Sequence, residues 1–434
     1  MLPLRRSAAR RDRLPAWWPE GVYYGWALVG TLGLTATVSY GVLSYAFAVF
    51  IDPMTRELGW SKATVTGAFS LASLIMGLAA MPVGRWVDRW GARGVMTAGS
   101  LLATLGLVAW SRVQSVAGFY AVWIVLGFAM AAVLYEPAFA VVATWFRAGR
   151  GRALTVLTFI GGFASVVFVP LATWLVAVHG WREAVLWLAA IYGPLTVLPH
   201  ALILRRRPAD LDLVPDGGLL RSETEGGFAD TPEPSVPPGE AIRSDSFRWL
   251  AVGFALASFI TTAVSVHLVP LLLERGYRPG FAGAAMGLLG LMALPGRLIF
   301  MPLGGRWPRA AVTASIFALQ ALACLILLWS RATLGVWMFV ILFGAGFGAI
   351  TPARAALVAE RYGSAHYGRI AGALAFAVSL ARAGAPVGAS WLYALGGGRT
   401  HGYDAVLGIL AVLSLGAGLA VLAARDGAPA LATV

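Results

Sequence analysis

Long apolar runs alternate with short polar breaks along almost the whole chain. An α-helix needs roughly 20 mainly apolar residues to cross the hydrocarbon core of a bilayer. Residues that end helices, such as Asp52-Pro53 and Pro279-Gly280, occupy the breaks between the runs. The pattern is typical of an all-α membrane protein with twelve transmembrane helices. They are predicted at residues 24–50, 61–83, 94–111, 116–145, 153–177, 184–204, 248–273, 281–303, 310–329, 334–359, 368–395 and 404–424.

The composition supports this fold class. Hydrophobic residues make up 59% of the 434 residues and charged residues only 12%, whereas about a quarter of the residues in a soluble domain are charged. A water-soluble fold of this length could not bury so much apolar surface in one core. The first apolar run, which follows Trp17 and Trp18, is longer than the apolar core of a signal peptide. We expect it to be an uncleaved first span.

Residues 208–247 differ from the rest of the chain, because acids and prolines crowd this segment. Such a composition cannot bury enough apolar surface to order itself. We therefore expect an N-terminal six-helix bundle at 1–207, a cytoplasmic acidic and Pro-rich linker at 208–247, and a C-terminal six-helix bundle at 248–434. The linker is either a passive tether or a regulatory segment.

The two expected bundles echo each other in sequence. The motif Met81-Pro82-Val83-Gly84-Arg85-Trp86 ends the second span, and Met301-Pro302-Leu303-Gly304-Gly305-Arg306-Trp307 ends the eighth. The equivalent positions of the two motifs indicate two pseudo-symmetric halves. Parallel repeats of this kind suit a transporter that rocks one half against the other.

The net charge of +13 comes from short arginine clusters between the apolar runs. A nucleic-acid partner would require these residues to gather on one soluble face, so we expect none. Most of the 33 Lys and Arg residues fall on one side of the twelve spans, and cytoplasmic loops are enriched in such residues. We therefore expect a multi-pass protein of the bacterial inner (plasma) membrane with both termini in the cytoplasm.

The loop between the second and third spans carries a motif, Gly84-Arg85-Trp86-Val87-Asp88-Arg89-Trp90-Gly91-Ala92-Arg93. It resembles the signature Gly-x-x-x-Asp-Arg-x-Gly-Arg-Arg of the major facilitator superfamily, with Ala92 in place of one basic residue. The resemblance implies that superfamily's fold of two six-helix bundles, and a monomer. Asp88 can latch one conformation by lying near a helix N-terminus or by pairing with arginine. The gating motif then consists of Gly84, Asp88, Arg89, Gly91 and Arg93.

Further motifs narrow the resemblance to the bacterial branch that is similar to monocarboxylate transporters and oxalate/formate antiporters. Gly296-Arg297-Leu298 in the eighth span matches that branch in the second half. The first-half motifs are Tyr24-Gly25-Trp26, Glu57-Leu58-Gly59-Trp60-Ser61, Trp145-Phe146 with Arg150 and Arg152-Ala153-Leu154, Gly161-Gly162, and Gly180-Trp181-Arg182.

Four charged residues fall well inside predicted spans, namely Glu136, Arg297, Arg354 and Arg382. Each costs at least about 2.5–3.5 kcal/mol on insertion scales, so each should face a partner or water. The fold that the resemblance implies places Glu136, Arg354 and His267 on helices around a central cavity. Three positive charges against one negative charge favour an anionic substrate, and the planar fork of arginine suits a carboxylate.

We therefore predict that Arg297, Arg354, Arg382 and Tyr135 bind the substrate and that Glu136 and His267 carry protons. The family often has an Asp four residues before its helix 8 arginine, where this chain has Ala293, so Glu136 is the buried acid left for proton coupling. Other roles stay open. Glu136 and Arg354 would serve equally as a structural tie between the halves, Arg382 could bind backbone carbonyls, and His267 could be a satisfied core histidine.

These expectations combine into a secondary transporter that moves a small organic anion, a monocarboxylate, by alternating access with proton coupling. The alternatives are an efflux pump for amphiphilic drugs and an anion exchanger. An enzyme is not expected, because the sequence has no phosphate-cradling Gly-Lys-Ser/Thr loop, no His-Glu-x-x-His site and no Gly-x-Ser-x-Gly elbow. We expect no cofactor and no metal site. The expected partners are the substrate anion, protons and the lipid bilayer.

Overall fold

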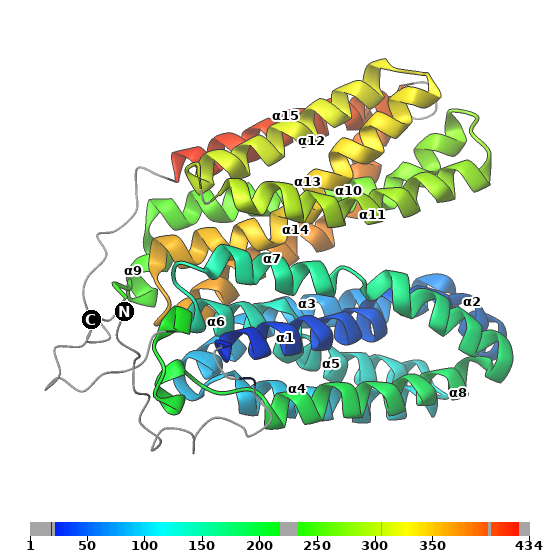
Figure 1. The fold of residues 1–434 in the computed structure, drawn as a ribbon. Helices are drawn as coiled ribbons and strands as arrows, with labels where there is room; N and C mark the ends of the chain where they lie inside the picture. The colour runs from blue at the N-terminus through cyan, green and yellow to red at the C-terminus, as the bar shows by residue number, and fades with distance from the viewer. Residues whose placement is uncertain (1–18, 20–21, 218–232, 305, 398–400, 425–434) are drawn as a thin grey trace, which may run out of the picture.

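The fold is almost entirely helical (Figure 1). The computed structural model describes residue 19 and residues 22–217, 233–304, 306–397 and 401–424. The N-terminal arginine cluster, Trp17 and Trp18, and residues 218–232 of the predicted linker lie outside the described residues. So do residues 398–400 and 425–434.

The helices of the first half begin after Tyr24 and end at Leu202. They are α1 (Gly25–Tyr40), the π-helix η2 (Gly41–Tyr45), α2 (Phe47–Leu58), α3 (Lys62–Trp90), α4 (Ala92–Ser111), α5 (Val116–Val133), α6 (Tyr135–Trp145), α7 (Arg150–Gly161) and α8 (Ala164–Leu202). Three short helices follow: η3 (Pro208–Leu211), η4 (Pro215–Gly217) and α9 (Pro238–Arg243). The remaining helices are α10 (Asp245–Glu274), α11 (Pro279–Leu303), α12 (Arg309–Trp329), α13 (Thr333–Tyr362), α14 (Tyr367–Leu395) and α15 (Gly402–Ala423).

Eleven helical stretches of the described chain are long and apolar enough to cross a membrane. One of them, Arg150–Leu202, has 53 residues and contains two of the predicted spans. The two parts meet at Gly180, whose φ of 77° and ψ of 167° interrupt the helix. Glycine adopts such a φ without the steric penalty of a Cβ atom. The prediction of an all-α, multi-pass membrane protein is confirmed.

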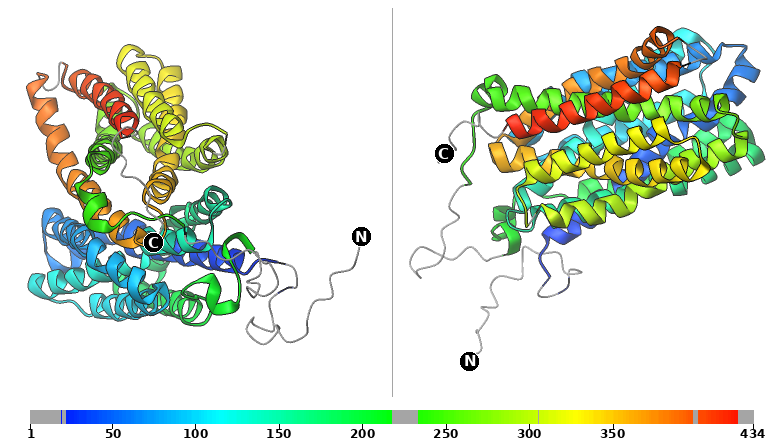
Figure 2. Two further views of the ribbon diagram at one scale, coloured as in Figure 1. Left: turned by 90° about the vertical axis from the view of Figure 1, so that its left-hand side faces the viewer. Right: turned by 90° about the horizontal axis from the view of Figure 1, so that it is seen from above.

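The long helices form two groups. Helices α1 to α8 pack against one another, and helices α10 to α15 do the same (Figure 1). Seen end-on, the groups lie one above the other (Figure 2). They touch mainly along α3 with α14 and along α7 with α11. One large apolar cluster crosses this boundary, while a second is confined to α10–α15.

Glycines allow the close approach of helices both between the two groups and within the second group. A Cβ atom on Gly84 of α3 would lie 1.9 Å from the backbone oxygen of Gly368 in α14. A Cβ atom on Gly348 of α13 would lie 1.9 Å from the backbone oxygen of Ala293 in α11. Small residues of this kind are the usual means by which transmembrane helices pack tightly. Gly84 therefore has a packing role at the boundary between the two groups.

Candidate functional site

A cavity of about 470 Å³ lies between the two groups of helices. This volume falls within the range of sites for small molecules, roughly 300–1,000 Å³. Its wall includes Tyr40, Tyr45, Tyr135, Glu136, Arg297, Arg354 and Arg382. Eight residues named in the sequence analysis thus share one cavity, namely Tyr135, Glu136, Gly161, Gly162, Ala293 and the three intramembrane arginines.

The helices of the first group are interrupted where they line this cavity. Helix α1 passes into the π-helix Gly41–Tyr45. Helices α5 and α6 meet at Leu134, whose φ of −82° and ψ of −161° are extended. Helix α7 ends at Gly161, and α8 begins at Ala164. Irregular backbone at membrane depth is tolerated where protein or a water-filled cavity surrounds it, and π-turns are frequent at functional sites.

The break at Leu134 places Glu136 in the first turn of α6. A carboxylate is favoured there, because the helix N-terminus carries partial positive charge. Glu136 accepts a hydrogen bond from the guanidinium of Arg354 in α13. The two side chains are 24% and 13% exposed, respectively. The pair joins the two groups of helices, as the alternative of a structural tie between the halves requires.

Arg297 also reaches across the boundary. Its Nε donates to the backbone oxygen of Gly348 at 3.1 Å, and its Nη1 donates to the backbone oxygen of Thr158 in α7. A Cβ atom on Gly162 would lie 2.3 Å from Nη1 of Arg297. The Gly161-Gly162 motif therefore leaves room for the arginine, and two of its five N–H donors are used on carbonyls.

Arg382 differs from the other two arginines. Its side chain is exposed and lines the cavity. Within the described part of the chain it has no hydrogen bond or ion pair, so the alternative that it binds backbone carbonyls receives no support. Arg382 is therefore the cavity arginine whose donors are available to a ligand.

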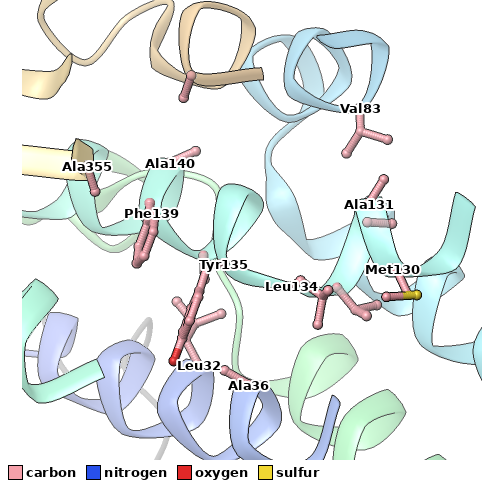
Figure 3. Packing of buried hydrophobic residues seen from close by; sticks show 14 of the residues in the cluster. Leu32, Ala36, Val83, Met130, Ala131, Leu134, Tyr135, Phe139, Ala140 and Ala355 are labelled. Atoms are coloured by element: carbon pink, nitrogen blue, oxygen red, sulfur yellow. The ribbon is translucent and has the colours of Figure 1, made fainter. Parts of the chain in front are cut away.

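Aromatic rings form the wall of the cavity on the side of the first group. The rings of Tyr40 and Tyr135 have centroids 4.6 Å apart, and Tyr135 stacks on Phe139 at 5.1 Å. Figure 3 shows Tyr135 directed from α6 toward Leu32 and Ala36 of α1. A Cβ atom on Gly161 would lie 2.3 Å from the Tyr135 hydroxyl. Tyr135 is thus held by packing, with its hydroxyl end toward the cavity wall.

His267 is not among the residues that line the cavity. Its ring lies between α10, α14 and α15. Its Nδ1 is 3.4 Å from the Tyr403 hydroxyl, and its Nε2 is 3.4 Å from the backbone oxygen of Pro386 and from Ser390 Oγ. The structure therefore separates His267 from Glu136 and the arginines.

The predicted gating motif lies at the junction of α3 and α4, beside the start of α14. Asp88 accepts hydrogen bonds from the backbone N–H groups of Gly368 at 2.7 Å and Arg369 at 2.8 Å. These N–H groups belong to the first turn of α14, where a carboxylate is stabilised by the helix dipole. Asp88 therefore bonds the first group to the second at a helix N-terminus, one of the two modes expected for it.

The other motif residues shape the turn between α3 and α4. Gly91 ends α3 with a φ of 82°, a conformation that favours glycine. The guanidinium of Arg89 lies 5.3 Å from the centre of the Trp90 ring. The backbone oxygen of Arg89 accepts a hydrogen bond from the Arg206 side chain. Arg93 is exposed at the start of α4.

A row of hydroxyls on α10 was not predicted. Ser258, Thr261 and Ser265 line the cavity, and the Oγ of Ser258 is buried with no hydrogen-bond partner in the described structure. Their spacing of three and four residues puts them on one helix face. This periodic set of hydroxyls in an apolar helix is the signal that sequence reasoning could have used.

The family model of the Major Facilitator Superfamily matches residues 32–386. The chain belongs to the Major Facilitator Superfamily. The recognition that rested on the loop after α3 is therefore confirmed by a match that extends over most of both groups of helices.

Individual members of the superfamily refine this assignment. Monocarboxylate transporter 11 of Mus musculus is 29% identical over 282 residues, which cover 63% of this chain and 57% of the relative. The oxalate:formate antiporter of Oxalobacter formigenes is 28% identical over 156 residues, which cover 36% of this chain and 37% of the relative. The chain thus spans little more than half the length of the monocarboxylate transporters it matches. The predicted resemblance to this branch is confirmed.

A solved structure shows the same fold. The crystal structure of the human organic anion transporter MFSD10 superimposes with a TM-score of 0.69 at 17% identity. The superposition covers 93% of this chain and 100% of the other. At this low identity the likeness concerns the fold alone.

Proposed function

We propose that this protein is a secondary transporter that moves a small organic anion by alternating access. In this proposal the bundles 1–207 and 248–434 rock against each other around the cavity, and the linker 208–247 joins them. The members of the superfamily described above are named as transporters, which are not enzymes. Protons and the lipid bilayer are the other partners.

The charge balance of the cavity carries the proposal. Its wall holds three arginines and one glutamate. Arg354 is neutralised by Glu136, Arg297 is engaged by backbone carbonyls, and Arg382 is available. Arg297 and Arg382 thus have no counter-ion among the residues that line the cavity, so an anion that enters the cavity balances their charge.

A carboxylate fits these donors best. We expect Arg382 to form the first contact with the carboxylate, because its donors are not used within the described chain. Arg297 has donors beyond the two that it uses, since a guanidinium has five N–H groups, and Arg354 becomes available when Glu136 releases it. Tyr135 packs against the rest of the substrate. The similarity to monocarboxylate transporter 11 favours a monocarboxylate.

Proton coupling follows from competition for Arg354. While Glu136 is ionised, it occupies the guanidinium that a substrate carboxylate would bind. Protonation of Glu136 removes the competing charge, so a proton and an anion enter the cavity together. His267 lies on α10, away from this pair, and is a second candidate for the proton carrier.

The proposed placement is the bacterial inner membrane, with a monomer whose termini lie in the cytoplasm. The distribution of arginines favours this orientation. The loops after α3, α6, α8, α11 and α13 would then face the cytoplasm, together with the motif around Asp88.

The proposal is tested with purified protein in proteoliposomes that contain a pH-sensitive dye. Lactate, pyruvate, formate and oxalate are added outside in turn. Acidification of the lumen with at least one of them is expected, together with its loss in Arg382→Gln. Arg112→Gln, which neutralises an exposed arginine outside the cavity, is the matched control and should transport normally. If none of the four carboxylates acidified the lumen, and none was exchanged for preloaded carboxylate either, the proposal would be excluded.

Anion exchange is the second candidate. It is favoured by one observation, that the only carboxylate among the residues lining the cavity is already paired with Arg354. An exchanger needs no proton carrier. Uptake that requires preloaded carboxylate and leaves the lumenal pH unchanged would establish it.

A further inference from the structure

The two described ends of the central segment converge on the junction of α6 and α7. Residues 208–217 and 233–236 flank the part of the linker that lies outside the described structure. The first end contacts the loop between α6 and α7, and the second contacts Arg150 at the start of α7. This loop, residues 146–149, leads directly into Arg150 at the start of α7.

The side chain of Asp216 binds backbone N–H groups of the loop between α6 and α7. The Asp216 carboxylate accepts from the N–H groups of Arg147 at 3.0 Å, Ala148 at 2.8 Å and Gly149 at 2.9 Å. Burial and the nearby Asp216 carboxylate raise the pKa of Tyr23, whose hydroxyl donates to the backbone oxygen of Trp145. Asp216 therefore anchors the first end of the segment to the first group of helices.

Glu233 binds the side chain of Arg150, the residue that follows this loop. Nη2 of Arg150 donates to both carboxylate oxygens of Glu233, at 3.0 Å and 2.9 Å. The Arg150 side chain is 5% exposed and that of Glu233 is 20% exposed. Arg150 is held further by the backbone oxygens of Phe146 and Ala143. This ion pair is well shielded from water, so solvent screens it less than a surface pair.

The residues after Glu233 bind the second group. The N–H of Val236 donates to the backbone oxygen of Tyr362 at 3.0 Å, and Ser235 Oγ accepts from the N–H of Ala365 at 3.3 Å. Gly363 has a φ of 75°, and a Cβ atom there would lie 2.2 Å from Ser235 Oγ. The chain then continues through α9, which packs on α10 and α14.

We propose that residues 233–236 form a strap that holds this end of the transporter closed, with the Glu233–Arg150 ion pair as its releasable contact. The strap is fixed to the second group by Ser235 and Val236, so the ion pair joins one group to the other. Separation of the groups at this end must break it. The linker is then a conformational latch rather than a passive tether, in addition to the contact that Asp88 makes with α14.

The proposal rests on alternating access, but its test needs no substrate. Spin labels are placed on Gly94→Cys in α4 and Ser315→Cys in α12, in a Cys324→Ala background. Both positions are exposed near the end in question, and Cys324 is the chain's one cysteine. Distances between the labels are measured by double electron–electron resonance spectroscopy on protein in nanodiscs. The matched control is Glu240→Gln, because Glu240 is an exposed acid of α9 with the same charge change.

Glu233→Gln should raise the ratio of long to short distances roughly tenfold, which is the scale expected for loss of a charge-assisted hydrogen bond. Glu240→Gln should leave the ratio unchanged. Ser235→Ala should give a smaller shift in the same direction, and it provides the answer if Glu233→Gln does not fold. Unchanged distances in both strap variants would overturn the proposal. Since no substrate is present, failure of anion transport would not affect this result.

Discussion

The two groups of helices line the same cavity with different types of side chain and with helices of different regularity. The first group contributes tyrosines, the single glutamate and three interrupted helices, at Gly41–Tyr45, at Leu134 and between α7 and α8. The second group contributes Arg297, Arg354 and Arg382 on helices that run unbroken past the cavity. The two groups of helices thus differ in both charge and backbone regularity.

This difference suggests a division of labour. Arginines on continuous helices have fixed backbone positions, which suits recognition of a carboxylate. Interrupted helices have fewer backbone hydrogen bonds at the breaks, so they can change conformation at lower cost. We therefore expect the second group to bind the anion and the first group to supply the proton site and the moving wall.

The largest effect should come from separating the pair that joins the groups. Arg354→Gln leaves Glu136 without its partner at membrane depth, and breaking a buried pair from one side costs about 3–5 kcal/mol. The melting temperature in detergent should fall by several degrees. The double variant Glu136→Gln/Arg354→Gln should recover most of the loss. Equal stability of the wild type and Arg354→Gln would show that the pair is no structural tie.

The second largest effect concerns proton coupling by Glu136 in the first group of helices. Glu136→Gln mimics the protonated acid, so it should abolish proton-coupled uptake while exchange of carboxylate across the membrane continues at near wild-type rates. Lumenal pH and radiolabelled counterflow in the same proteoliposomes measure the two activities. Normal acidification by Glu136→Gln would assign proton coupling elsewhere, with His267→Gln as the next variant.

The third effect contrasts glycines on the two sides of the cavity. Gly162→Ala places a methyl group against Arg297 and Leu294, and overpacking costs about 1–3 kcal/mol. Gly290→Ala is the matched control, because Gly290 also lines the cavity but a Cβ atom added there would have nothing within 4 Å. Thermal unfolding should show loss of stability in the first variant alone. Similar melting curves for both would argue against a tight fit of Arg297 beside α7.

The smallest effect should come from the aromatic wall. Tyr135→Phe keeps the ring that stacks on Phe139 and removes only the hydroxyl. Loss of one hydrogen-bonding group changes an equilibrium by about two- to tenfold. We expect KM for the carboxylate to rise within that range, with kcat unchanged. A complete loss of transport would give Tyr135 a larger role than packing.

The positions of the spans could be read from the sequence because bilayer thickness imposes a minimum apolar length. The intramembrane charges were also predictable, since a charge in hydrocarbon must have a partner or water. The pairing of Glu136 with Arg354 was one of the alternatives that the sequence left open. Asp88 was found through a motif whose capping role has a simple electrostatic cause.

Other features depend on contacts between distant segments and leave little local trace. The break at Leu134 has no glycine or proline at that residue, and its nearest local signal is Pro137 in the first turn of α6, which cannot donate a hydrogen bond to the carbonyl of Val133. The binding of Arg297 to the carbonyls of Thr158 and Gly348 is a tertiary contact. The composition of the linker predicts no ordered core, yet single acids such as Asp216 and Glu233 dock its ends. Composition averages over a segment and cannot locate such individual contacts.

Binding of a carboxylate to the cavity is the most direct test of the proposed function. Isothermal calorimetry would compare the carboxylate panel on purified wild type, Arg382→Gln and Arg112→Gln at one pH. We predict that at least one carboxylate binds the wild type and Arg112→Gln with similar affinity and that Arg382→Gln loses at least about tenfold, the effect of roughly one charge-assisted contact. Equal binding by Arg382→Gln, or no binding of any carboxylate to the wild type, would contradict the assignment of the cavity to an organic anion.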